Sequence, residues 1–317
     1  MRQRSFDRLC RRAFLAGAAA LTVLPAAIRA ADLAVVNVGM VPLDIDGDVS
    51  YAQDQGYYAA AGLDVHLNQL SSGPAITNAV LGGSLDIGTG NVGSVIVARS
   101  RGIPLKLIAP SGIAAAMELT EPIAVRKDSA IHSGADLNGK TVAINAVKTM
   151  QYAAVLLWID KHGGDSKTVK FIEMPVSEMP AALDSHRVDA VLPGEPFTTM
   201  MSGYTRSLGS QYGSMQLPFP IFATFSTEQW LAAHGDVAAK FAGALQRAAV
   251  WSNSHHKETA VMLARLAKVD QQMATTMGRI TYGTTFDPKS LQPIIEALLR
   301  YGIIDKPIDA TDLIWQK

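Results

Sequence analysis

The sequence predicts an α/β protein built from two lobes, and three observations support this. The chain has 317 residues, a length at which one hydrophobic core becomes hard to extend and two domains are favoured. From Ala34 to Ala109, short apolar stretches alternate with helical ones in the order β-α-β-α-β. A unit with the same order begins near Pro122. Such alternation is typical of parallel sheets whose faces are covered by helices.

Glycine and proline mark the ends of the elements in the first unit. Gly62, Gly82-Gly83 and Gly102 each follow a helical stretch, in the usual position just past a helix end. Pro74 suits the first position of a helix. The expected strands are Ala34–Val38, Leu63–Leu67, Leu85–Ile87 and Leu105–Ala109, and the expected helices are Ser50–Ala61, a segment opened by Ser71-Ser72-Gly73-Pro74, and Asn91–Arg101.

The second unit repeats this organisation. Ala79-Val80 precedes Leu85-Asp86 by the same spacing with which Ala182-Leu183 precedes Val188-Asp189. One such match is weak support for a duplication, but it agrees with two lobes of like architecture. The expected strands of this unit are Ile123–Val125, Thr141–Asn145, Val169–Met174 and Ala190–Leu192, and its expected helices are Met150–His162 and Ser177–Ser185.

Beyond Phe219 the chain is expected to be mainly helical. No low-complexity linker separates the two units, so we expect them to be joined by two strands, near Ala114–Pro122 and Leu217–Thr224. The first lobe is then discontinuous and comprises residues 31–118 with 222–317, while the second comprises residues 119–221. Helices are expected at the apolar stripe Val237, Phe241, Leu245 and Ala248, at Glu258–Lys268 and at Ser290–Arg300.

Residues 1–30 have the composition of an export signal. Five arginines precede the Ala-rich stretch Phe14–Ala27, which is too short to span a bilayer and is followed by the cleavage-like Ile28-Arg29-Ala30. The alternative, an N-terminal core helix, fits five preceding arginines less well. Arg11-Arg12-Ala13-Phe14-Leu15 resembles the twin-arginine motif, although Cys10 and Ala16 depart from it. The general secretory route is the alternative pathway, and we expect a soluble periplasmic protein after cleavage.

The charge of the chain depends on this segment. Lys+Arg and Asp+Glu both number 28, and residues 1–30 hold six Arg and one Asp, which leaves 22 basic and 27 acidic residues and a net charge near −5. An acidic protein has no field that would hold a polyanion, so nucleic acid is not an expected partner. Cys10 is the one cysteine. A single thiol builds neither a disulfide framework nor a Cys-rich zinc site.

Two glycine-rich motif matches lack the context that nucleotide binding requires. Residues 134–141 match the P-loop pattern, but a P-loop opens a helix, whereas a short capped helical turn at Ser133–Leu137 here precedes the expected strand Thr141–Asn145. Residues 88–93 match the dinucleotide fingerprint. The first carboxylate after Asp86 is Glu118, so the acidic residue expected about 20 residues on is missing. We interpret residues 88–93 as a turn that aims backbone N–H groups at a sheet end.

The sequence offers no site for a metal, a cofactor or a catalytic nucleophile. Asp44-Ile45-Asp46-Gly47-Asp48 suggests a calcium loop, but position twelve is Gln55 instead of Glu, so a solvated acidic loop is expected. The seven histidines lack metal-ligand spacing, and no serine lies in a Gly-x-Ser-x-Gly elbow. We therefore expect no cofactor and no metal.

Several stretches resemble one known family. They are residues 56–65 (GYYAAAGLDV), 83–88 (GSLDIG), 136–143 (DLNGKTVA), 188–190 (VDA) and Phe241–Trp251. Together they resemble the periplasmic solute-binding proteins of ABC importers, in the nitrate, sulfonate, taurine and thiamine-precursor group. The resemblance implies the type II periplasmic binding protein fold, with two Rossmann-like α/β lobes on a two-strand hinge that close on a ligand. It also implies delivery to an ABC permease driven by a separate ATPase, and we expect a monomer.

The resemblance implies capture of a small organic anion or zwitterion, such as a sulfonate, taurine or nitrate. The alternative is an enzyme on the same fold that acts on a sulfur- or pyrimidine-type metabolite. Sulfinate desulfinases and thiamine-pyrimidine synthases with this fold use cysteines, and the chain after residue 30 has none.

Candidate ligand residues lie where strands of a doubly wound lobe end, since ligands bind there. Ser72 and Asn91 are equally well explained as helix caps. Glu195 is at least as well explained as a turn residue that caps the next helix, and methionine is more often ordinary core. The candidates are Met40, Ser71, Ser72, Gly73, Gly90, Asn91, Asn145, Met150, Gln151 and Glu195.

These candidates combine two opposite preferences for charge. Helix N-termini favour an anionic group, whereas the Glu195 carboxylate favours an amine or an N–H-bearing heterocycle. A zwitterion such as an aminosulfonate, or a pyrimidine, satisfies both.

Overall fold

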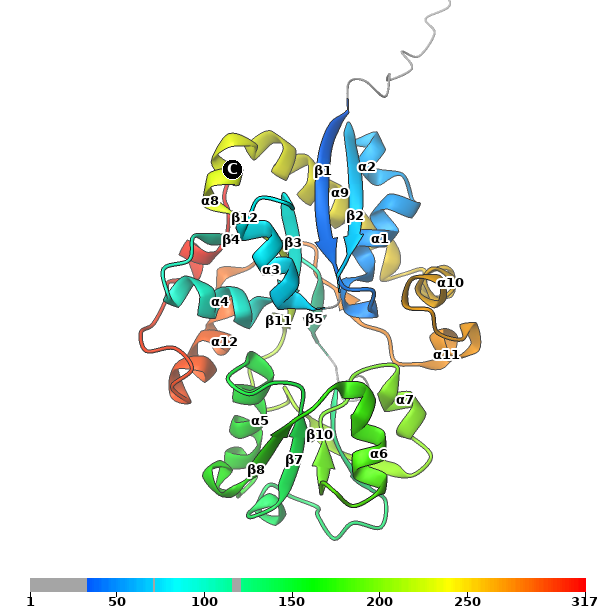
Figure 1. Ribbon diagram of the computed structural model, residues 1–317, viewed down its shortest axis with the longest axis vertical. Coiled ribbons are helices and arrows are strands. Elements are labelled where there is room, and N and C mark those ends of the chain that lie inside the picture. Colours follow the sequence, from blue (N-terminus) through cyan, green and yellow to red (C-terminus); the bar gives the residue numbers. More distant parts are fainter. Residues whose placement is uncertain (1–32, 71, 116–120) are drawn as a thin grey trace, which may run out of the picture. The chain divides into compact units, whose positions relative to one another are not determined.

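The computed structural model describes residues 33–70, 72–115 and 121–317. Two five-stranded sheets form the framework of the chain (Figure 1). The first sheet has the order β2-β1-β3-β12-β4. Strands β1, β2 and β3 are parallel, and β12 is inserted antiparallel between β3 and β4. The strands are β1 (Ala34–Met40), β2 (Leu63–Gln69), β3 (Ile87–Asn91), β4 (Leu105–Pro110) and β12 (Phe222–Thr227).

The second sheet repeats this topology with the order β10-β6-β9-β7-β8. Strands β7, β8 and β9 are parallel, and β6 lies antiparallel between β9 and β10. We call the first sheet, with the helices that pack on it directly or through another helix, the first lobe, and the second sheet with its helices the second lobe. The strands are β6 (Pro122–Arg126), β7 (Thr141–Ile144), β8 (Lys170–Glu173), β9 (Ala190–Val191) and β10 (Thr205–Ser210).

The short sequence repeat corresponds to one structural device used in both lobes. In the first lobe, the Asp86 carboxylate accepts a hydrogen bond from the Asn37 backbone N–H on β1, at 2.7 Å. In the second lobe, the Asp189 carboxylate accepts one from the Thr141 backbone N–H on β7, at 2.8 Å. Each aspartate therefore ties the turn before its lobe's third parallel strand to the first strand.

A third, antiparallel sheet of three short strands lies beside the expected crossings. Its order is β11-β5-β13, with β5 at Gly112–Ala114, β11 at Phe219–Pro220 and β13 at Thr281–Tyr282. Strands β5 and β11 lie at the start of the two segments in which the sequence predicts strand crossings. Strand β13, from the C-terminal part of the chain, has no counterpart in that prediction.

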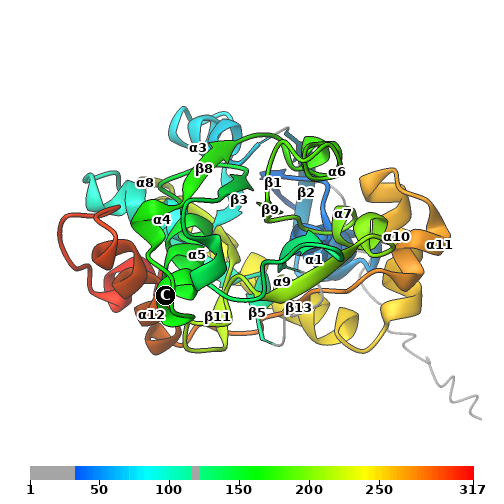
Figure 2. The same cartoon turned by 90° about the horizontal axis from the view of Figure 1, so that it is seen from below.

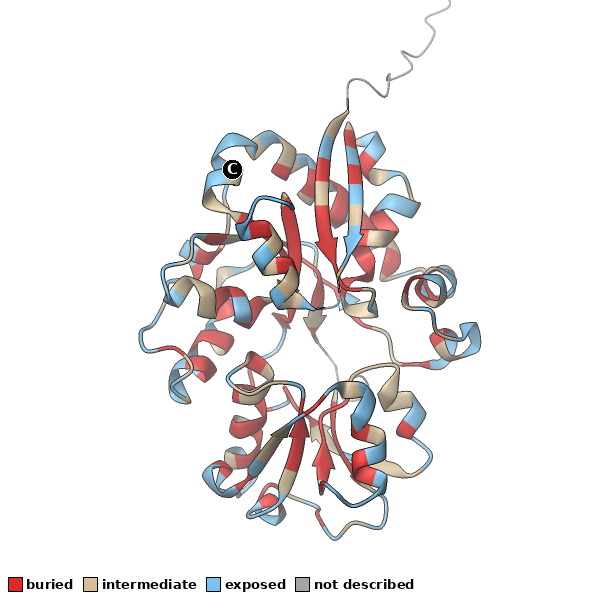
Figure 3. Ribbon diagram, in the orientation of Figure 1, coloured by how far each residue is buried: buried red, intermediate tan, exposed pale blue. Residues whose placement is uncertain are grey.

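Helices cover both faces of each sheet (Figures 1 and 2). In the second lobe, Val142 and Ile144 of β7 pack with α5 on one face, and Ala143 packs with α6 on the other, as the two-residue period of a strand requires. Figure 3 shows buried residues concentrated on the strands and on the helix faces turned toward them. The α/β class and the layered architecture predicted from the sequence are therefore confirmed.

The helices of the first lobe are α1 (Gly47–Asp54), α2 (Tyr57–Ala60), α3 (Gly73–Leu81), α4 (Val92–Ser100), α8 (Glu228–Ala233), α9 (Gly235–Ser252), α10 (His256–Ala267), α11 (Gln271–Thr276) and α12 (Pro288–Arg300). Those of the second lobe are α5 (Met150–Lys161), α6 (Met179–Asp184) and α7 (Phe197–Met201). Single 3₁₀ turns lie at Asp44–Asp46, Ala135–Leu137, Ser166–Thr168, Val176–Glu178 and Ala310–Leu313. Across the part of the chain that the structure describes, no helix is long and apolar enough to cross a membrane.

Three local expectations were wrong. The helix predicted over Ser50–Ala61 is two helices, because Gly56 adopts a left-handed backbone conformation (φ +69°) between α1 and α2. Strand β3 runs to Asn91 instead of ending at Ile87. Strand β10, which lies at the edge of the second sheet, was not predicted, because Thr205–Ser210 has little apolar alternation.

Candidate functional site

A cavity of about 570 Å³ receives side chains from both lobes. The first lobe contributes residues from the N-terminal ends of α3 and α4, and the second contributes residues from the strand ends and from the start of α5. Aromatic side chains such as Phe197, Tyr212 and Phe222 form apolar parts of the wall. A cavity of this size and mixed lining is typical of a site for a small organic molecule.

Six of the ten residues predicted from the sequence line this cavity. They are Gly73, Gly90, Asn91, Asn145, Gln151 and Glu195. The doubly wound pattern places these turns at one end of each sheet, which is why reasoning from strand ends finds them.

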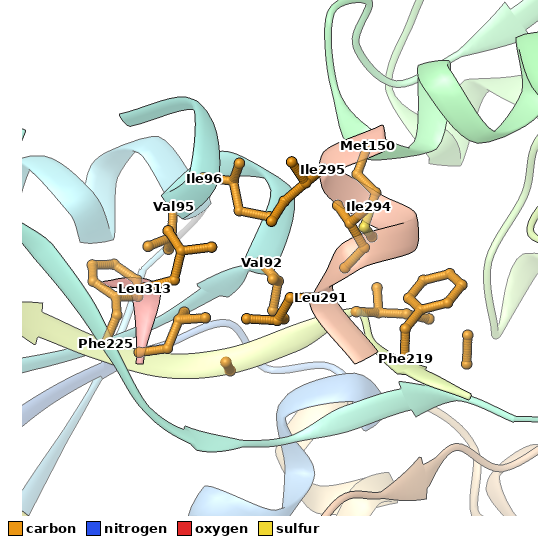
Figure 4. Close-up of a cluster of buried hydrophobic side chains, with 14 of the residues drawn as sticks. Val92, Val95, Ile96, Met150, Phe219, Phe225, Leu291, Ile294, Ile295 and Leu313 are labelled. Carbon is orange, nitrogen blue, oxygen red and sulfur yellow. The ribbon is translucent and has the colours of Figure 1, made fainter. Parts of the chain in front are cut away.

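Three other candidates do not line the cavity, and Ser71 lies outside the described residues. Ser72 is exposed and accepts the Ala75 backbone N–H at 3.4 Å, so its capping interpretation fits the structure. Met40 and Met150 are fully buried in hydrophobic clusters. Figure 4 shows Met150 beside Ile294 of α12. For both methionines, ordinary core packing is the better interpretation.

Helix N-termini face the cavity from both lobes. Gly73 and Pro74 line it at the start of α3, and Thr149 and Gln151 line it at the start of α5. Asn91 occupies the N-cap position of α4, but its side chain makes no capping hydrogen bond. The positive ends of the helix dipoles give this part of the cavity a preference for a negatively charged group.

The glycines of the apparent dinucleotide fingerprint serve packing within a strand, which corrects their interpretation as a turn. Gly88 and Gly90 lie in β3 and pair with β12. A Cβ atom on Gly88 would lie 2.6 Å from Ile76 Cγ2 and 2.9 Å from Phe225 Cζ. Close packing of α3 and β12 against β3 therefore requires glycine at position 88.

The apparent P-loop also lacks the geometry of a nucleotide site. Its residues form the 3₁₀ turn Ala135–Leu137 followed by β7. The Asp136 carboxylate caps this turn by accepting the backbone N–H groups of His132 and Ser133, at 2.9 and 3.0 Å. The order of turn before strand, predicted from the sequence, is confirmed.

Glu195 both caps a helix and lines the cavity. Its carboxylate accepts the Thr199 backbone N–H at 3.1 Å and the Thr199 hydroxyl at 2.9 Å, in the first turn of α7. It also accepts the backbone N–H of Gly278 at 3.1 Å. Gly278 follows α11, which packs through α10 against α1 of the first lobe. Glu195 therefore makes a hydrogen bond between the two lobes.

Glu121 is a cavity residue that the sequence analysis missed. It immediately precedes β6, and burial, followed by the proximity of Glu195, raises the pKa of its carboxyl group to about 8. No motif or spacing in the sequence distinguishes Glu121 from an ordinary surface glutamate. Only the fold, which places it opposite Gly194 with Oε1 3.6 Å from where a Cβ of residue 194 would lie, reveals it.

A chain of amide side chains leads to Glu121. The Gln151 Nε2 group donates a hydrogen bond to Gln211 Oε1 at 2.8 Å. Gln211 Nε2 in turn donates to Glu121 Oε2, and the Gln211 backbone N–H donates to the Glu121 carbonyl at 3.0 Å. This leaves Gln151 Oε1 buried with no hydrogen-bond partner among the described residues, and Asn91 Oδ1 is in the same condition.

The segment Asp44–Asp48 is not the solvated acidic loop that the sequence predicts. Arg279, which follows α11, binds Asp44 in a buried pair with an Nη2–Oδ1 distance of 2.7 Å. Asp46 and Asp48 are fully buried and accept hydrogen bonds from the hydroxyls of Thr89 and Ser111. Long-range partners stabilise these carboxyl groups, and a local sequence pattern does not reveal such partners.

The described residues contain no group of three or more histidine, cysteine, aspartate or glutamate side chains that could hold a metal ion. Among the described residues that line the cavity there is also no lysine, arginine or histidine. The polar groups that the described residues present to this cavity are therefore carboxylates, amides and helix ends.

Comparisons with known proteins identify a family and a fold for the chain. A family model described as NMT1/THI5 like matches residues 48–259. Curated protein sequences include no significant match to the chain.

Solved structures resemble the chain over nearly its whole length. The periplasmic aliphatic sulphonate-binding protein SsuA of Escherichia coli is 16% identical, with a TM-score of 0.74 over 89% of this chain and 92% of that one. The periplasmic nitrate-binding protein NrtA of Synechocystis PCC 6803 is 16% identical, with a TM-score of 0.71 over 88% and 84%. The desulfurization enzyme DSZB is 15% identical, with a TM-score of 0.64 over 90% and 97%. At such identities the likeness shows the fold alone, which is that of periplasmic binding proteins.

Proposed function

Because the chain belongs to the NMT1/THI5-like family, we propose that it is an extracytoplasmic solute-binding protein that captures a small organic molecule between its lobes. The cavity with walls from both lobes is the observation that carries this proposal. The hydrogen bond from Gly278 to Glu195 joins the lobes beside it. Contacts that exist only when both lobes meet are what select a closed, ligand-bound state.

The solute of this proposal is an organic anion or a zwitterion, with its negative group at the helix ends. The N-termini of α3 and α5 supply backbone N–H groups and a positive dipole end without a basic side chain. The sulphonate- and nitrate-binding proteins with the same fold bind anions, as their names say. The apolar walls favour an organic body over a bare inorganic ion.

The remaining parts of the proposal concern the place and partners of the protein. We propose that residues 1–30 direct export to the periplasm, that the lobes comprise residues 31–118 with 222–317 and residues 119–221, and that the protein acts as a monomer. Its partners are an ABC permease and the ATPase that drives it. The ligand residues proposed from the sequence are retained for Gly73, Gly90, Asn91, Asn145, Gln151 and Glu195, all of which line the cavity.

The proposal treats the protein as a binding protein and not as an enzyme. The cysteine chemistry of desulfinases and of thiamine-pyrimidine synthases is closed to a chain whose one cysteine is Cys10. The resemblance to a desulfurization enzyme extends to the fold, and a fold does not fix a function.

A thermal-shift screen of the purified protein tests the proposal. The panel comprises alkanesulfonates, taurine, nitrate, aromatic carboxylates and pyrimidines. A ligand that binds the folded state raises the melting temperature with its concentration, by mass action. We expect one class to do so, with a stoichiometry of one in calorimetry and no chemical change of the solute. Turnover of a stabilising compound, or a panel without any stabiliser, would argue against the proposal.

A further inference from the structure

The charged groups around the cavity are unbalanced. Asp44, Glu121 and Glu195 line it, and the described lining residues include no basic side chain. Asp44 is neutralised by Arg279, whose Nε and Nη2 atoms both lie within 3.1 Å of its carboxylate. The two glutamates therefore remain as the ionisable groups that a ligand meets.

Of these two glutamates, Glu121 has the greater free capacity to accept hydrogen bonds. The Glu195 carboxylate already accepts three donors, two from Thr199 and one from Gly278. The Glu121 carboxylate has one partner among the described residues, the Gln211 side chain, and that bond occupies Oε2. Glu121 is thus a half-buried carboxyl group with one oxygen, Oε1, that accepts no hydrogen bond from the described residues.

The neighbouring amides add unpartnered acceptors beside Glu121. Gln151 and Gln211 each spend an N–H group on the next residue in the chain that ends at Glu121. Two amide oxygens of the lining, Gln151 Oε1 and Asn91 Oδ1, are buried without a partner among the described residues. Buried polar atoms in native proteins are nearly always paired, so these acceptors call for donors that a ligand brings.

We propose that Glu121 binds a positively charged, N–H-bearing end of the solute, and that Gln151 and Asn91 accept its further hydrogen bonds. The inference rests on the proposed solute-binding function and deepens it, because it fixes the charge of one end of the solute as cationic. Together with an anionic group at the helix ends, it makes the solute a zwitterion. A simple anion such as nitrate carries no N–H donor and no positive charge for Glu121, Gln151 and Asn91.

Proton release accompanies binding in this scheme. Burial and the neighbouring Glu195 raise the pKa of Glu121 to about 8, so at pH 7 the free protein holds a proton on this group. The other ionisable groups nearby are Tyr212, whose pKa burial and Glu121 raise, and Glu195, which is itself near the Asp44–Arg279 pair. An incoming ammonium group ionises Glu121, and one proton passes to solvent as the carboxylate–ammonium pair forms.

Calorimetry with matched solutes tests the inference. The probes are taurine against ethanesulfonate and 2-phenylethylamine against 2-phenylethanol, measured with the wild-type protein in two buffers of different ionisation enthalpy. We expect the amine of each binding pair to bind roughly tenfold or more tightly than its partner, as for a hydrogen bond to a charged group. We also expect release of nearly one proton per amine at pH 7 and clearly less at pH 8.5, where most of Glu121 is already ionised while the amines are still largely protonated.

A substitution and its control assign this effect to one residue. Glu121→Gln keeps the shape and the bond to Gln211, and we expect it to abolish proton release and to weaken the amine to the level of the amine-free partner. Glu296→Gln makes the same change on the exposed face of α12. We expect it to leave the proton release and the affinity for the amine unchanged.

The outcomes separate this inference from the function on which it rests. Amine-free solutes that bind as tightly as amines, or amines that bind without releasing a proton, overturn the role of Glu121 and leave solute capture standing. If none of the four probes and none of the thermal-shift panel binds, both fail. The proton count comes from the wild-type protein, so a poorly folded Glu121→Gln variant does not remove the test.

Discussion

Asp46 is a carboxyl group that the sequence assigns to a surface loop and the structure places in the core. Asp46 and Asp48 are both fully buried, and each has one carboxyl oxygen without a partner among the described residues. Burial is the largest effect and raises the pKa of Asp46 to about 7, although hydrogen bonds from Thr89 and Val41 oppose it. Burial also raises the pKa of Asp48 well above its usual range.

Asp46→Asn is therefore expected to stabilise the protein above pH 7 and to change little below pH 4. An aspartate in the unfolded chain titrates near 3.9. The folded state thus binds more protons between these two pKa values, and the free energy of unfolding falls as the pH rises from about 4 to 7. Asparagine cannot ionise, so the variant does not lose free energy of unfolding in this way. For a difference of about three pKa units, the loss in the wild-type protein is on the order of 4 kcal/mol.

Urea unfolding of both proteins between pH 4 and 8 measures this difference. Asp305→Asn, which makes the same change at an exposed position, should give a small offset that does not vary with pH. A pH-independent effect of Asp46→Asn would mean that its carboxyl group does not titrate in this window.

The sequence of strand β3 predicts a turn, whereas the packing around it explains why its glycines lie in a strand. Gly88-Thr89-Gly90 looks like a phosphate-binding turn, yet these residues form the middle of a five-stranded sheet. A Cβ atom at position 88 would come within 2.9 Å of side-chain atoms of Ile76, Val80 and Phe225. Position 88 is a glycine because side chains of α3 and β12 fill the space that a Cβ atom would occupy.

Gly88→Ala is expected to destabilise the protein by roughly 1–3 kcal/mol, the usual cost of forcing extra volume into a packed core. Gly243→Ala is the matched control, because its Cβ meets nothing within 4 Å and it lies exposed in α9. There alanine should stabilise by up to about 1 kcal/mol, since glycine is a poor helix former. Thermal unfolding should move the two melting temperatures in opposite directions; a neutral Gly88→Ala would show that Ile76 and Phe225 yield easily.

Elements with a strong local signal were predictable, and those set by distant partners were not. Helix α5 begins at Met150 as expected, because Thr149 caps it and glycines follow its end. Strand β13 has only two residues, and it exists because β5 offers an edge to pair with. No local pattern marks such a strand.

For the candidate site, the sequence predicted the turns that line the cavity but not the charged residues whose partners lie far away in the chain. Strand ends led to Asn91, Asn145 and Gln151, because parallel sheets place such turns together. Glu121 escaped detection because its hydrogen-bond partner, Gln211, lies 90 residues away in the sequence. Likewise Arg279 lies 235 residues from the aspartate that it binds. Pairings at this separation depend on the folded chain as a whole.

Residues 1–30 decide where the whole molecule operates if they are an export signal. Changing both Arg11 and Arg12 to lysine keeps the positive charge but removes the arginine pair, so a twin-arginine substrate should remain in the cytoplasm. Fractionation of cells into cytoplasm and periplasm, followed by detection of the protein, measures this. Changing Arg2 and Arg4 to lysine makes the same chemical change outside the motif and should leave export intact. Periplasmic accumulation of the Arg11/Arg12 variant at the wild-type level would assign export to the general secretory route, which requires a basic start but no arginine pair.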